Sequence, residues 1–414
     1  MLALVDVNAC YASCEAIFRP DLRGKPIVVL SNNDGCIVAR SSEAKALAIP
    51  DLEPYFKLRK QLDAFGVEVF SSNYSLYGDI SRRIMQSLAT ETPHLEIYSI
   101  DEAFLDCTNL GDLSGFGHRI RKRIWREQRV GVGVGIAPTK TLAKLANQVA
   151  KRLPRAQGVC VLDTPEKWNW VLQRTAVNTV WGIGRRLASQ LAGLGVVTGA
   201  DLAALPPEVV RQQFSVTLER TVRELNGLSC LPLEEAPPPK QQIVSSRSFG
   251  RKIRSQKELE RAVAQHAWRA GEKLRQQGSI AMGLMVWINT SRFAPFPYSQ
   301  GLATPIAGGT DEGATLCRYA RQLTRRLYRP GYDYAKASVS LLDLVPASQH
   351  QADLFTASSN PRLNAVIDRI NHKYGSNSLR LADQWAPRDW AMLRRRLSPA
   401  YTTRWSDIPV IECR

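Results

Sequence analysis

The chain has 414 residues, more than one hydrophobic core usually organises, which indicates two to four domains. Its 55 Lys and Arg residues against 38 Asp and Glu give a net charge of +17, so the expected partner is a polyanion, with nucleic acid favoured over a membrane surface. No apolar run approaches the roughly 20 residues that cross a bilayer, and eight cysteines without a CxxC pair argue against disulfide and zinc frameworks. We therefore expect a cytoplasmic protein with no membrane partner.

Short apolar strands alternate with helical stretches in the N-terminal part, which is typical of an α/β core. The predicted strands cover residues 1–8, 26–30, 95–106 and 130–136, and the predicted helices cover residues 9–18 and 139–151. Residues 95–106 alternate as a half-buried hairpin strand. The strand at 130–136 alternates Val with Gly, and its glycine face is expected to let another backbone approach closely.

The remainder of the chain changes character at a proline-rich linker, residues 234–240, which marks a domain boundary. Residues 166–230 before it are predicted to be all-helical. After it, the periodicities predict strand 243–250, helix 257–276, strand 280–290, strand 301–307, helix 312–328 and strand 334–344. Residues 241–345 carry 16 basic and only 7 acidic side chains, so the main contact with a polyanion is expected there. Residues 346–361 are expected to form a flexible segment before further helical structure.

Three acidic residues are the main candidates for chemistry. Asp6 ends the first strand, and Asp101 and Glu102 are adjacent in the strand at 95–106. Hard oxygen donors suit magnesium, and two such ions roughly 3.5–4 Å apart are the usual arrangement for phosphoryl transfer. Neighbouring residues of a regular strand point to opposite faces, so Asp101 and Glu102 reach one site only if the backbone turns or bulges there.

Three ordered blocks of sequence resemble the Y-family DNA polymerases, which copy damaged templates. The blocks are DVNACYASCE at 6–15, SIDEAF at 99–104 and GVGIAPTKTLAK at 133–144. VLSNNDGC at 29–36 and FSSNY at 70–74 are similar to the bacterial UmuC-type members of this family, and the similarity runs over nearly the whole chain. The resemblance implies error-prone, template-directed DNA synthesis across lesions during the SOS response to DNA damage.

The fold class that the resemblance implies is an α+β multidomain protein, a right-hand polymerase. Its predicted domains are a ferredoxin-like palm with inserted small fingers at 1–165 (fingers about 20–75), a helical thumb with a helix-hairpin-helix at 166–233, the linker at 234–240, a β-α-β-β-α-β little finger at 241–345, and a tail at 346–414 with a sliding-clamp motif at 351–355. Primer-template DNA and a deoxynucleoside triphosphate are the expected substrates.

The family's site residues carry over by position. The implied ligands of two Mg²⁺ ions, with Mn²⁺ as an alternative, are Asp6, Asp101, Glu102 and the Val7 carbonyl. Tyr11 matches the steric gate, a ring under the incoming sugar that leaves no room for a 2′-hydroxyl. The residues expected to bind the nucleotide phosphates are Lys45, Lys151, Arg40 and Ser42. Many family members have a tyrosine where this chain has Ser42, and Arg40 is the hypothetical substitute for it.

Other candidates concern DNA. Residues 135–141 superficially resemble a phosphate-binding loop but are one residue short and lack the Gly before Lys, so a P-loop ATPase is rejected. Lys140 and Lys144 are expected to face DNA instead. The segment 181–186, WGIGRR, resembles a helix-hairpin-helix turn, whose backbone N–H groups bind a DNA phosphate. The DNA-binding residues predicted there and in the little finger are Gly182, Gly184, Arg185 and Arg247.

The tail is expected to bind partners. Residues 351–355, QADLF, resemble the sliding-clamp motif of bacterial polymerases, with Gln351, Leu354 and Phe355 as the contacts. The remaining tail resembles the C-terminus of UmuC-type proteins, which implies UmuD-type and RecA-type partners and a nucleoid-associated location in the bacterial cytoplasm. Two alternatives stay open. One is a nucleotidyl cyclase with a palm-like sheet, and the other is a non-catalytic DNA-binding scaffold that recruits other polymerases.

Overall fold

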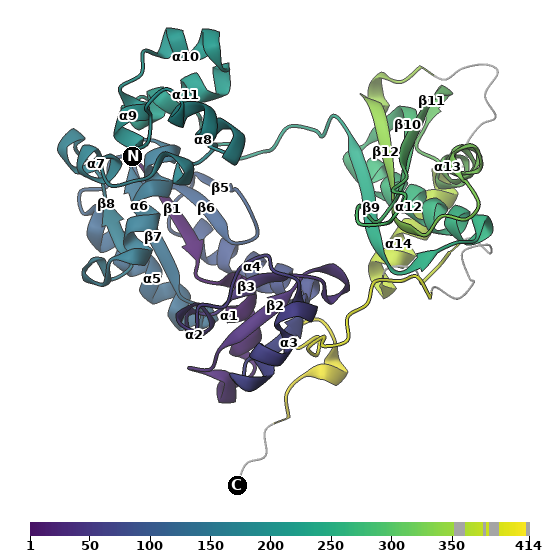
Figure 1. Cartoon of the computed structure of the whole chain (residues 1–414), viewed down its shortest axis with the longest axis horizontal. Coiled ribbons are helices and arrows are strands. Elements are labelled where there is room, and N and C mark those ends of the chain that lie inside the picture. Colours follow the sequence, from purple (N-terminus) through teal and green to yellow (C-terminus); the bar gives the residue numbers. More distant parts are fainter. Residues whose placement is uncertain (352–360, 376–377, 381–388, 411–414) are drawn as a thin grey trace. The chain divides into compact units, whose positions relative to one another are not determined.

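The structure is a computed structural model that describes residues 1–351, 361–375, 378–380 and 389–410. The chain forms two compact units (Figure 1). The first contains Met1–Ser31, Gly35–Pro237 and Arg396–Arg414, and the second contains Asn32–Asp34 and Pro238–Arg395. The division after Pro237 lies inside the proline-rich segment. No described helix has the length and apolar character needed to span a membrane.

A five-stranded sheet forms the centre of the first unit. Its order is β5 (Leu95–Ile97), β6 (Glu102–Asp106), β1 (Leu2–Val7), β7 (Val132–Ala137) and β8 (Val159–Val161). The predicted central strand is confirmed, because β1 pairs antiparallel with β6 on one side and with β7 on the other. The carboxyl end of β1 therefore lies between two neighbouring strands, where side chains from three strands can meet.

Helices cover both faces of this sheet. They are α1 (Cys10–Ile17), α4 (Tyr74–Ala89), α5 (Leu113–Gln128) and α6 (Lys140–Arg152). Alternation along β1 sends Ala3 and Val5 into the core shared with α1, α4 and α5, and sends Leu4 into the core shared with α6. A Cβ atom at Gly135 on β7 would lie 2.1 Å from the backbone nitrogen of Asn147 on α6. The close approach predicted for the glycine face is therefore confirmed.

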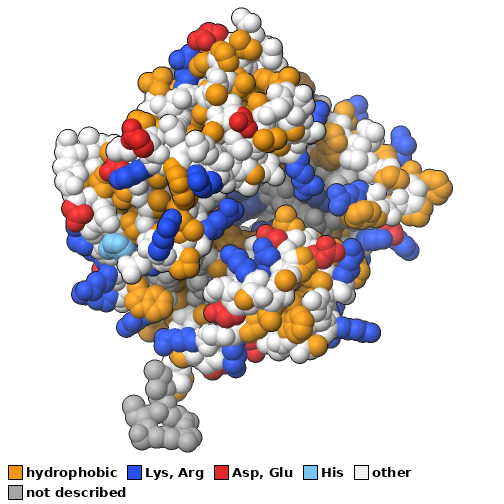
Figure 2. Space-filling model, turned by 60° about the vertical axis from the view of Figure 1, so that its left-hand side comes forward, with side chains coloured by type: hydrophobic (Ala, Val, Ile, Leu, Met, Phe, Trp, Pro, Cys, Tyr) orange, Lys and Arg blue, Asp and Glu red, His pale blue; other side chains and the backbone are white. Residues whose placement is uncertain are grey.

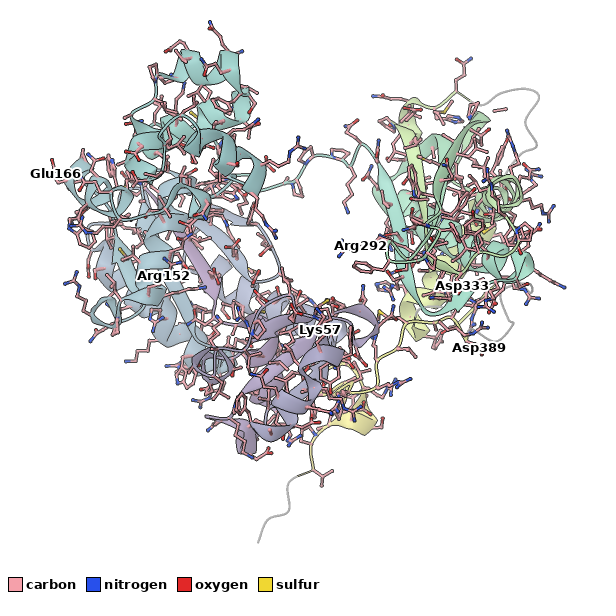
Figure 3. The ribbon with its side chains drawn as sticks, in the orientation of Figure 1. Lys57, Arg152, Glu166, Arg292, Asp333 and Asp389 are labelled. Atoms are coloured by element: carbon pink, nitrogen blue, oxygen red, sulfur yellow. The ribbon has the colours of Figure 1, made fainter. Side chains whose placement is uncertain are left out.

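A smaller sheet in the first unit has the order β3 (Ile37–Arg40), β2 (Ile27–Leu30) and β4 (Glu68–Ser71). The helices α2 (Ser42–Ala46) and α3 (Tyr55–Ala64), the latter marked by Lys57 in Figure 3, belong to the same region. All four residues of β2 are buried, because Ile27 and Val29 join the main core while Val28 and Leu30 join a separate small core. The main core thus fixes this sheet beside α1.

The stretch predicted to be all-helical contains α7 (Pro165–Leu172), α8 (Arg185–Ala192), α9 (Gly199–Ala203), α10 (Pro207–Gln213) and α11 (Val216–Leu225). Buried Glu224 on α11 accepts hydrogen bonds from the backbone N–H of Thr141 at 2.9 Å and from its hydroxyl at 2.8 Å. This carboxylate satisfies a free donor in the first turn of α6. The helices are thereby attached to the helix that covers the end of β1.

The second unit confirms the predicted β-α-β-β-α-β order. Its elements are β9 (Ile243–Ile253), α12 (Gln256–Gln277), β10 (Ser279–Thr290), β11 (Ser299–Thr310), α13 (Gly313–Leu327) and β12 (Tyr334–Pro346), followed by α14 (Pro361–Tyr374). The antiparallel sheet has the order β11-β10-β12-β9, and β11 is longer than predicted. Ile243 and Val286 are buried, whereas the adjacent Val244 and Trp287 are 47% and 41% exposed, so one face of the sheet is open.

Basic side chains mark the surface of the molecule. Lys and Arg stand out over much of the face drawn in Figure 2, and acidic side chains are fewer there. Several acidic side chains of the second unit form ion pairs, as at Asp333 (labelled in Figure 3), which accepts from Arg254 at 2.5 Å. Pairs of this exposed kind contribute little to stability.

Candidate active site

The carboxyl end of β1 brings the three predicted acids to one corner of the large sheet. Asp6 is directly opposite Glu102 on β6, and the backbone N–H of Val7 donates to the Asp101 carbonyl at 2.8 Å. Directly opposite residues on antiparallel strands have their Cβ atoms about 5 Å apart. Residues almost a hundred positions apart in the sequence are therefore neighbours.

A tight turn solves the problem of the two adjacent acids. The Ser99 hydroxyl accepts hydrogen bonds from the N–H groups of Asp101 at 3.1 Å and Glu102 at 3.0 Å, and donates to Asp101 Oδ1 at 2.6 Å. Asp101 consequently lies in the turn, whereas Glu102 is the first residue of β6. Sequence reasoning did not identify Ser99, although a serine two residues before an aspartate is a known pattern for such local turns.

Two lysines of α6 neutralise the acids. Lys151 Nζ forms an ion pair with Asp6, and Lys144 Nζ contacts the two carboxylate oxygens of Glu102 at 2.9 and 2.8 Å. Burial raises the pKa of Asp6 above its usual value, and the ion pair with Lys151 opposes that rise. The negative charges of Glu102 and Asp101 raise the Asp6 pKa further. Three carboxylates thus lie close together in a half-buried corner, where nearby cations offset their mutual repulsion.

The donor chemistry fits divalent cations. All three side chains offer carboxylate oxygens, the hard ligands that Mg²⁺ and Mn²⁺ prefer, and lysine ammonium groups already occupy the cationic positions beside two of them. Within the described part of the chain, no three acidic, His or Cys side chains converge on a single point. To hold metal ions here, the three carboxylates would have to turn toward one point, and the lysines would have to move away from Asp6 and Glu102.

A cavity of about 410 Å³ lies next to this corner. Its walls include Asp6, Val7, Tyr11, Arg40, Lys45, Asp101 and Lys151. Seven residues predicted to hold metal or nucleotide thus line one cavity, whereas Glu102, which pairs with Asp6 across the two strands, is not among its lining residues. The cavity is bounded by the large sheet, α1, the β3–α2 region and α6, so every wall belongs to the first unit.

Tyr11, the second residue of α1, lies in the wall of this cavity. Ala9 adopts a left-handed conformation, with φ 47° and ψ 47°, which lets α1 begin immediately after β1. The Tyr11 ring stacks on Tyr77 of α4, with centroids 4.6 Å apart and an interplanar angle of 16°. Burial raises the pKa of Tyr11 to about 12, so its hydroxyl stays protonated at neutral pH.

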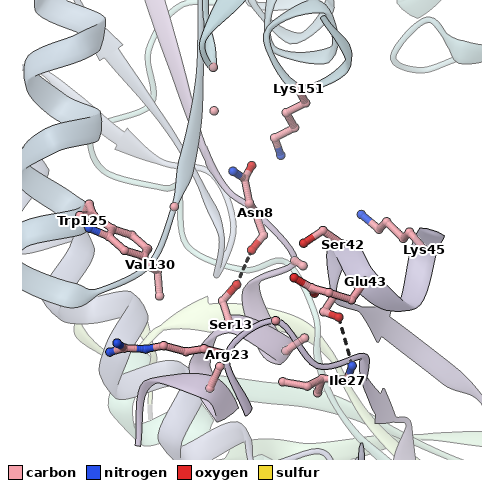
Figure 4. A pocket seen from close by; sticks show the side chains of 18 of the residues that line it. Asn8, Ser13, Arg23, Ile27, Ser42, Glu43, Lys45, Trp125, Val130 and Lys151 are labelled. Atoms are coloured by element: carbon pink, nitrogen blue, oxygen red, sulfur yellow. Dashed lines mark hydrogen bonds between the residues drawn. The ribbon is translucent and has the colours of Figure 1, made fainter. Parts of the chain in front are cut away.

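The side chains expected to bind phosphate differ in how strongly hydrogen bonds and ion pairs already hold them. Arg40 donates to the Ile49 carbonyl at 2.6 Å and pairs with Asp51 at 3.3 Å, so its guanidinium is fixed at the cavity wall. Lys45 has no acidic partner within 4 Å among the described residues. Ser42 lines a second, adjoining cavity of about 680 Å³ that shares Lys45 and Lys151 with the first (Figure 4).

One expectation about α6 is wrong. Lys140 does not face DNA, because its side chain is buried, pairs with Glu96 and donates to the Pro232 carbonyl at 2.7 Å. Lys144, four residues later on the same helix face, approaches Glu102 and the rings of Tyr98 and Trp181. The four-residue spacing places both lysines on the same face of α6. Their partners differ because Lys140 meets Glu96 of β5, whereas Lys144 meets Glu102 of β6.

The predicted DNA-binding residues before α8 are not among the residues that line this cavity. Gly182 has a φ of 89°, a conformation that favours glycine, and Gly184 immediately precedes α8. Arg185 begins α8 and is exposed. The open turn before α8 has the backbone features expected of a phosphate-binding turn.

Arg247 lies on the helix side of the second unit's sheet. It pairs in register with buried Ala337, and its positive charge lowers the pKa of His266 on α12 after the larger effect of burial. Ser245, two residues earlier, contacts the same histidine at 3.0 Å. The open face of β9 therefore presents Val244, and Arg247 reaches solvent at the sheet edge. In the tail, Gln351 is described, whereas Leu354 and Phe355 lie outside the described residues.

Known proteins are similar to this chain over almost its full length. Residues 5–148 match the impB/mucB/samB family, residues 240–354 match the C-terminal domain of that family, and residues 361–411 match a domain of unknown function. Protein UmuC of Salmonella typhimurium is 44% identical over 419 residues, covering 99% of each chain. Protein MucB of Escherichia coli is 41% identical with the same coverage, and DNA polymerase IV of Moorella thermoacetica is 28% identical over 92% of this chain and 95% of its own.

Solved structures agree on the fold. A Y-family DNA polymerase chimera of Dbh and Dpo4 segments superposes with a TM-score of 0.67 and 22% identity, covering 83% of this chain and 99% of that chain. An insertion ternary complex of Dbh DNA polymerase gives a TM-score of 0.54 at 21% identity, with the same coverage.

The fold and the relatives define the class, a Y-family DNA polymerase of the translesion type. The chain belongs to the impB/mucB/samB family, with its UmuC-type and MucB-type relatives. It is therefore an error-prone, DNA-directed DNA polymerase of the DNA-damage response, and both the cyclase and the non-catalytic scaffold are set aside. Enzymes of this class use divalent metal ions.

Proposed function

We propose that the corner formed by Asp6, Asp101 and Glu102 joins a deoxynucleotide to a primer 3′-hydroxyl. The observation that carries this proposal is the direct pairing of Asp6 with Glu102, with Asp101 in the adjoining turn, beside a cavity lined by Tyr11 and two lysines. Two Mg²⁺ ions, or Mn²⁺ in their place, held by the three carboxylates and the Val7 carbonyl, would lower the pKa of the attacking hydroxyl and stabilise the leaving pyrophosphate.

The basic residues of the cavity are proposed to bind the triphosphate. Lys151 now pairs with Asp6, and Lys45 extends from α2 without an acidic partner among the described residues, so both are suited to phosphate oxygens. Arg40 is held rigidly and offers its charge from the wall of the same cavity. The Ser42 hydroxyl is short, which widens the space above the nucleotide and suits a polymerase that accepts distorted templates.

Tyr11 is proposed to select the sugar. Its ring lies in the cavity wall and is supported from behind by Tyr77, so it presents a flat surface of fixed position. A 2′-hydroxyl placed against such a ring would clash or lose its hydrogen bonds, which disfavours ribonucleotides.

Domain roles and partners follow the family pattern. We assign residues 1–165 to palm and fingers, 166–233 to the thumb, 241–345 to the little finger and 346–414 to a partner-binding tail. Primer-template DNA would contact the turn at Gly182, Gly184 and Arg185 and the basic second unit with Arg247. A sliding clamp at Gln351, Leu354 and Phe355, UmuD-type and RecA-type partners, and a place on the nucleoid in the bacterial cytoplasm complete the proposal.

Primer extension tests the site. Purified full-length chain, with and without a UmuD-type protein, should extend a primer in Mg²⁺ and the four deoxynucleotides, whereas Asp101→Ala should abolish extension. Asp63→Asn is the matched control, because Asp63 on α3 is exposed and its only ion pair found among the described residues is a long one of 3.9 Å with Arg59. Full activity of Asp101→Ala would show that the metal site lies elsewhere.

A further inference from the structure

The C-terminal segment Arg396–Tyr401, which belongs to the first unit, packs against the N-terminal part of that unit. The Ser71 N–H at the end of β4 donates to the Arg396 carbonyl at 2.9 Å, and the Arg396 N–H donates to the Ser71 hydroxyl at 3.0 Å. The Tyr401 ring stacks on Phe18, with centroids 4.7 Å apart. This segment belongs to the matched domain of unknown function, so its position assigns it a structural partner.

Ser398 is the buried centre of this contact. The side-chain amide of Asn73 donates to the Ser398 carbonyl at 3.2 Å and to its hydroxyl at 3.0 Å. The Ser398 hydroxyl in turn donates to Glu15 Oε1 at 3.1 Å, across 383 residues of sequence. Glu15 is 1% exposed, and its Oε2 is buried without a hydrogen-bond partner among the described residues. The position of the carboxylate therefore depends on the donors to Oε1.

The second donor leads to the active site. The Tyr77 hydroxyl donates to Glu15 Oε1 at 2.5 Å, and the Tyr77 ring is the one on which Tyr11 stacks. Tyr11 and Glu15 lie one turn apart on α1, and Asn73 and Tyr77 lie one turn apart at the start of α4. Two adjacent helices thus connect the C-terminal segment to the ring in the cavity wall through four side chains in continuous contact.

We infer that the C-terminal segment fixes the position of Tyr11 and thereby sets how strongly the polymerase rejects ribonucleotides, with Ser398, Glu15 and Tyr77 as positioning residues. The inference rests on the proposed role of Tyr11 in sugar selection. A stacked pair of rings resists sliding only weakly, and the Tyr77 hydroxyl bond to a buried carboxylate adds a directional constraint to the packing around the fully buried Tyr77 ring. Displacements of about 1 Å are enough to change a site's selectivity.

Single-nucleotide insertion by the full-length chain tests the inference. The measured quantity is the ratio of kcat/KM for a deoxynucleoside triphosphate to that for the matching ribonucleotide. Tyr77→Phe keeps the ring and removes the hydroxyl, Ser398→Ala removes the donor to Glu15, and Ser398→Thr keeps a hydroxyl. We expect the first two to lower the ratio about three- to tenfold, the third to retain it, and Ser406→Ala, an exposed serine of the same tail, to leave it unchanged.

Tyr11→Ala separates the two proposals, since it should lower the ratio by about a hundredfold. If Tyr11→Ala lowers the ratio but Tyr77→Phe and Ser398→Ala leave it within about twofold of wild type, the role of the C-terminal segment is refuted and the sugar gate stands. An equal loss of activity toward both nucleotides in Ser398→Ala would also refute it, because a purely structural contact gives that result. An unchanged ratio in Tyr11→Ala would remove the gate and the inference together. If Ser398→Ala does not fold, Tyr77→Phe decides.

Discussion

Asp6 and Glu15 are two carboxylates nine residues apart whose surroundings differ in kind. Burial raises the pKa of both, to about 7 for Glu15. Asp6 is paired with a lysine and faces a cavity, whereas Glu15 is closed in by the hydroxyls of Tyr77 and Ser398. A carboxylate paired with a lysine side chain can exchange that ammonium group for another cation, so Asp6 is suited to bind a metal ion. A carboxylate held by buried hydroxyls can only fix the positions of its neighbours.

The strongest test of this contrast removes one charge at a time. Asp6→Asn should lower primer extension by about a thousandfold or more, because the site loses a ligand of both proposed ions. It should also weaken Mn²⁺ binding, which can be followed by paramagnetic relaxation. Glu15→Gln should change deoxynucleotide extension by less than about threefold. Similar losses in the two variants would break the comparison.

A smaller effect is expected at the lysine beside Asp6. Lys151→Met keeps most of the side-chain length and removes the charge, so it should raise the KM for the deoxynucleotide about ten- to a hundredfold. Steady-state kinetics with saturating DNA would measure this. Lys122→Met serves as the control, because Lys122 is an exposed lysine on α5 that lines neither cavity. A loss confined to kcat would contradict the assignment to phosphate binding.

The last expected effect is on stability and not on activity, because Glu15 makes stability depend on pH. Its pKa is about 7 in the folded chain against 4.5 for an ordinary glutamate, so the folded state binds the proton more tightly. The stabilisation is full below pH 4.5 and is lost as pH rises through 7, about 3 kcal/mol in all. The hydrogen bond to Cys10 raises the pKa of Cys14, and burial raises that of Tyr77, so neither titrates in this window.

Denaturant unfolding of wild type and Glu15→Gln between pH 4.5 and 7.5 would measure this dependence. The unfolding free energy of the wild type minus that of Glu15→Gln should fall as pH rises. A constant difference would mean that the carboxylate is charged throughout and that the buried hydroxyls stabilise it more than burial penalises it.

Local pattern was sufficient for much of the fold. Short apolar runs and their periodicities located β1, the second unit and the approach of α6 over glycine, because these depend on residues close in sequence. The turn at Asp101 was predicted as a requirement of the metal site, and Ser99 supplies it. The pairing of Glu15 with Ser398 and the burial of Lys140 were not predictable, since each depends on a partner distant in sequence.

Gly133 on β7 lies directly opposite Asp6. A Cβ atom there would come within 2.9 Å of Lys151 Cε. The absence of a side chain at Gly133 therefore leaves the space through which the Lys151 side chain reaches Asp6. Together with Gly135, which sets the separation of α6 from the sheet, it makes the reach of Lys151 toward Asp6 depend on backbone spacing. An alanine at either glycine would therefore change how Lys151 meets Asp6, although its own methyl group would press only on α6.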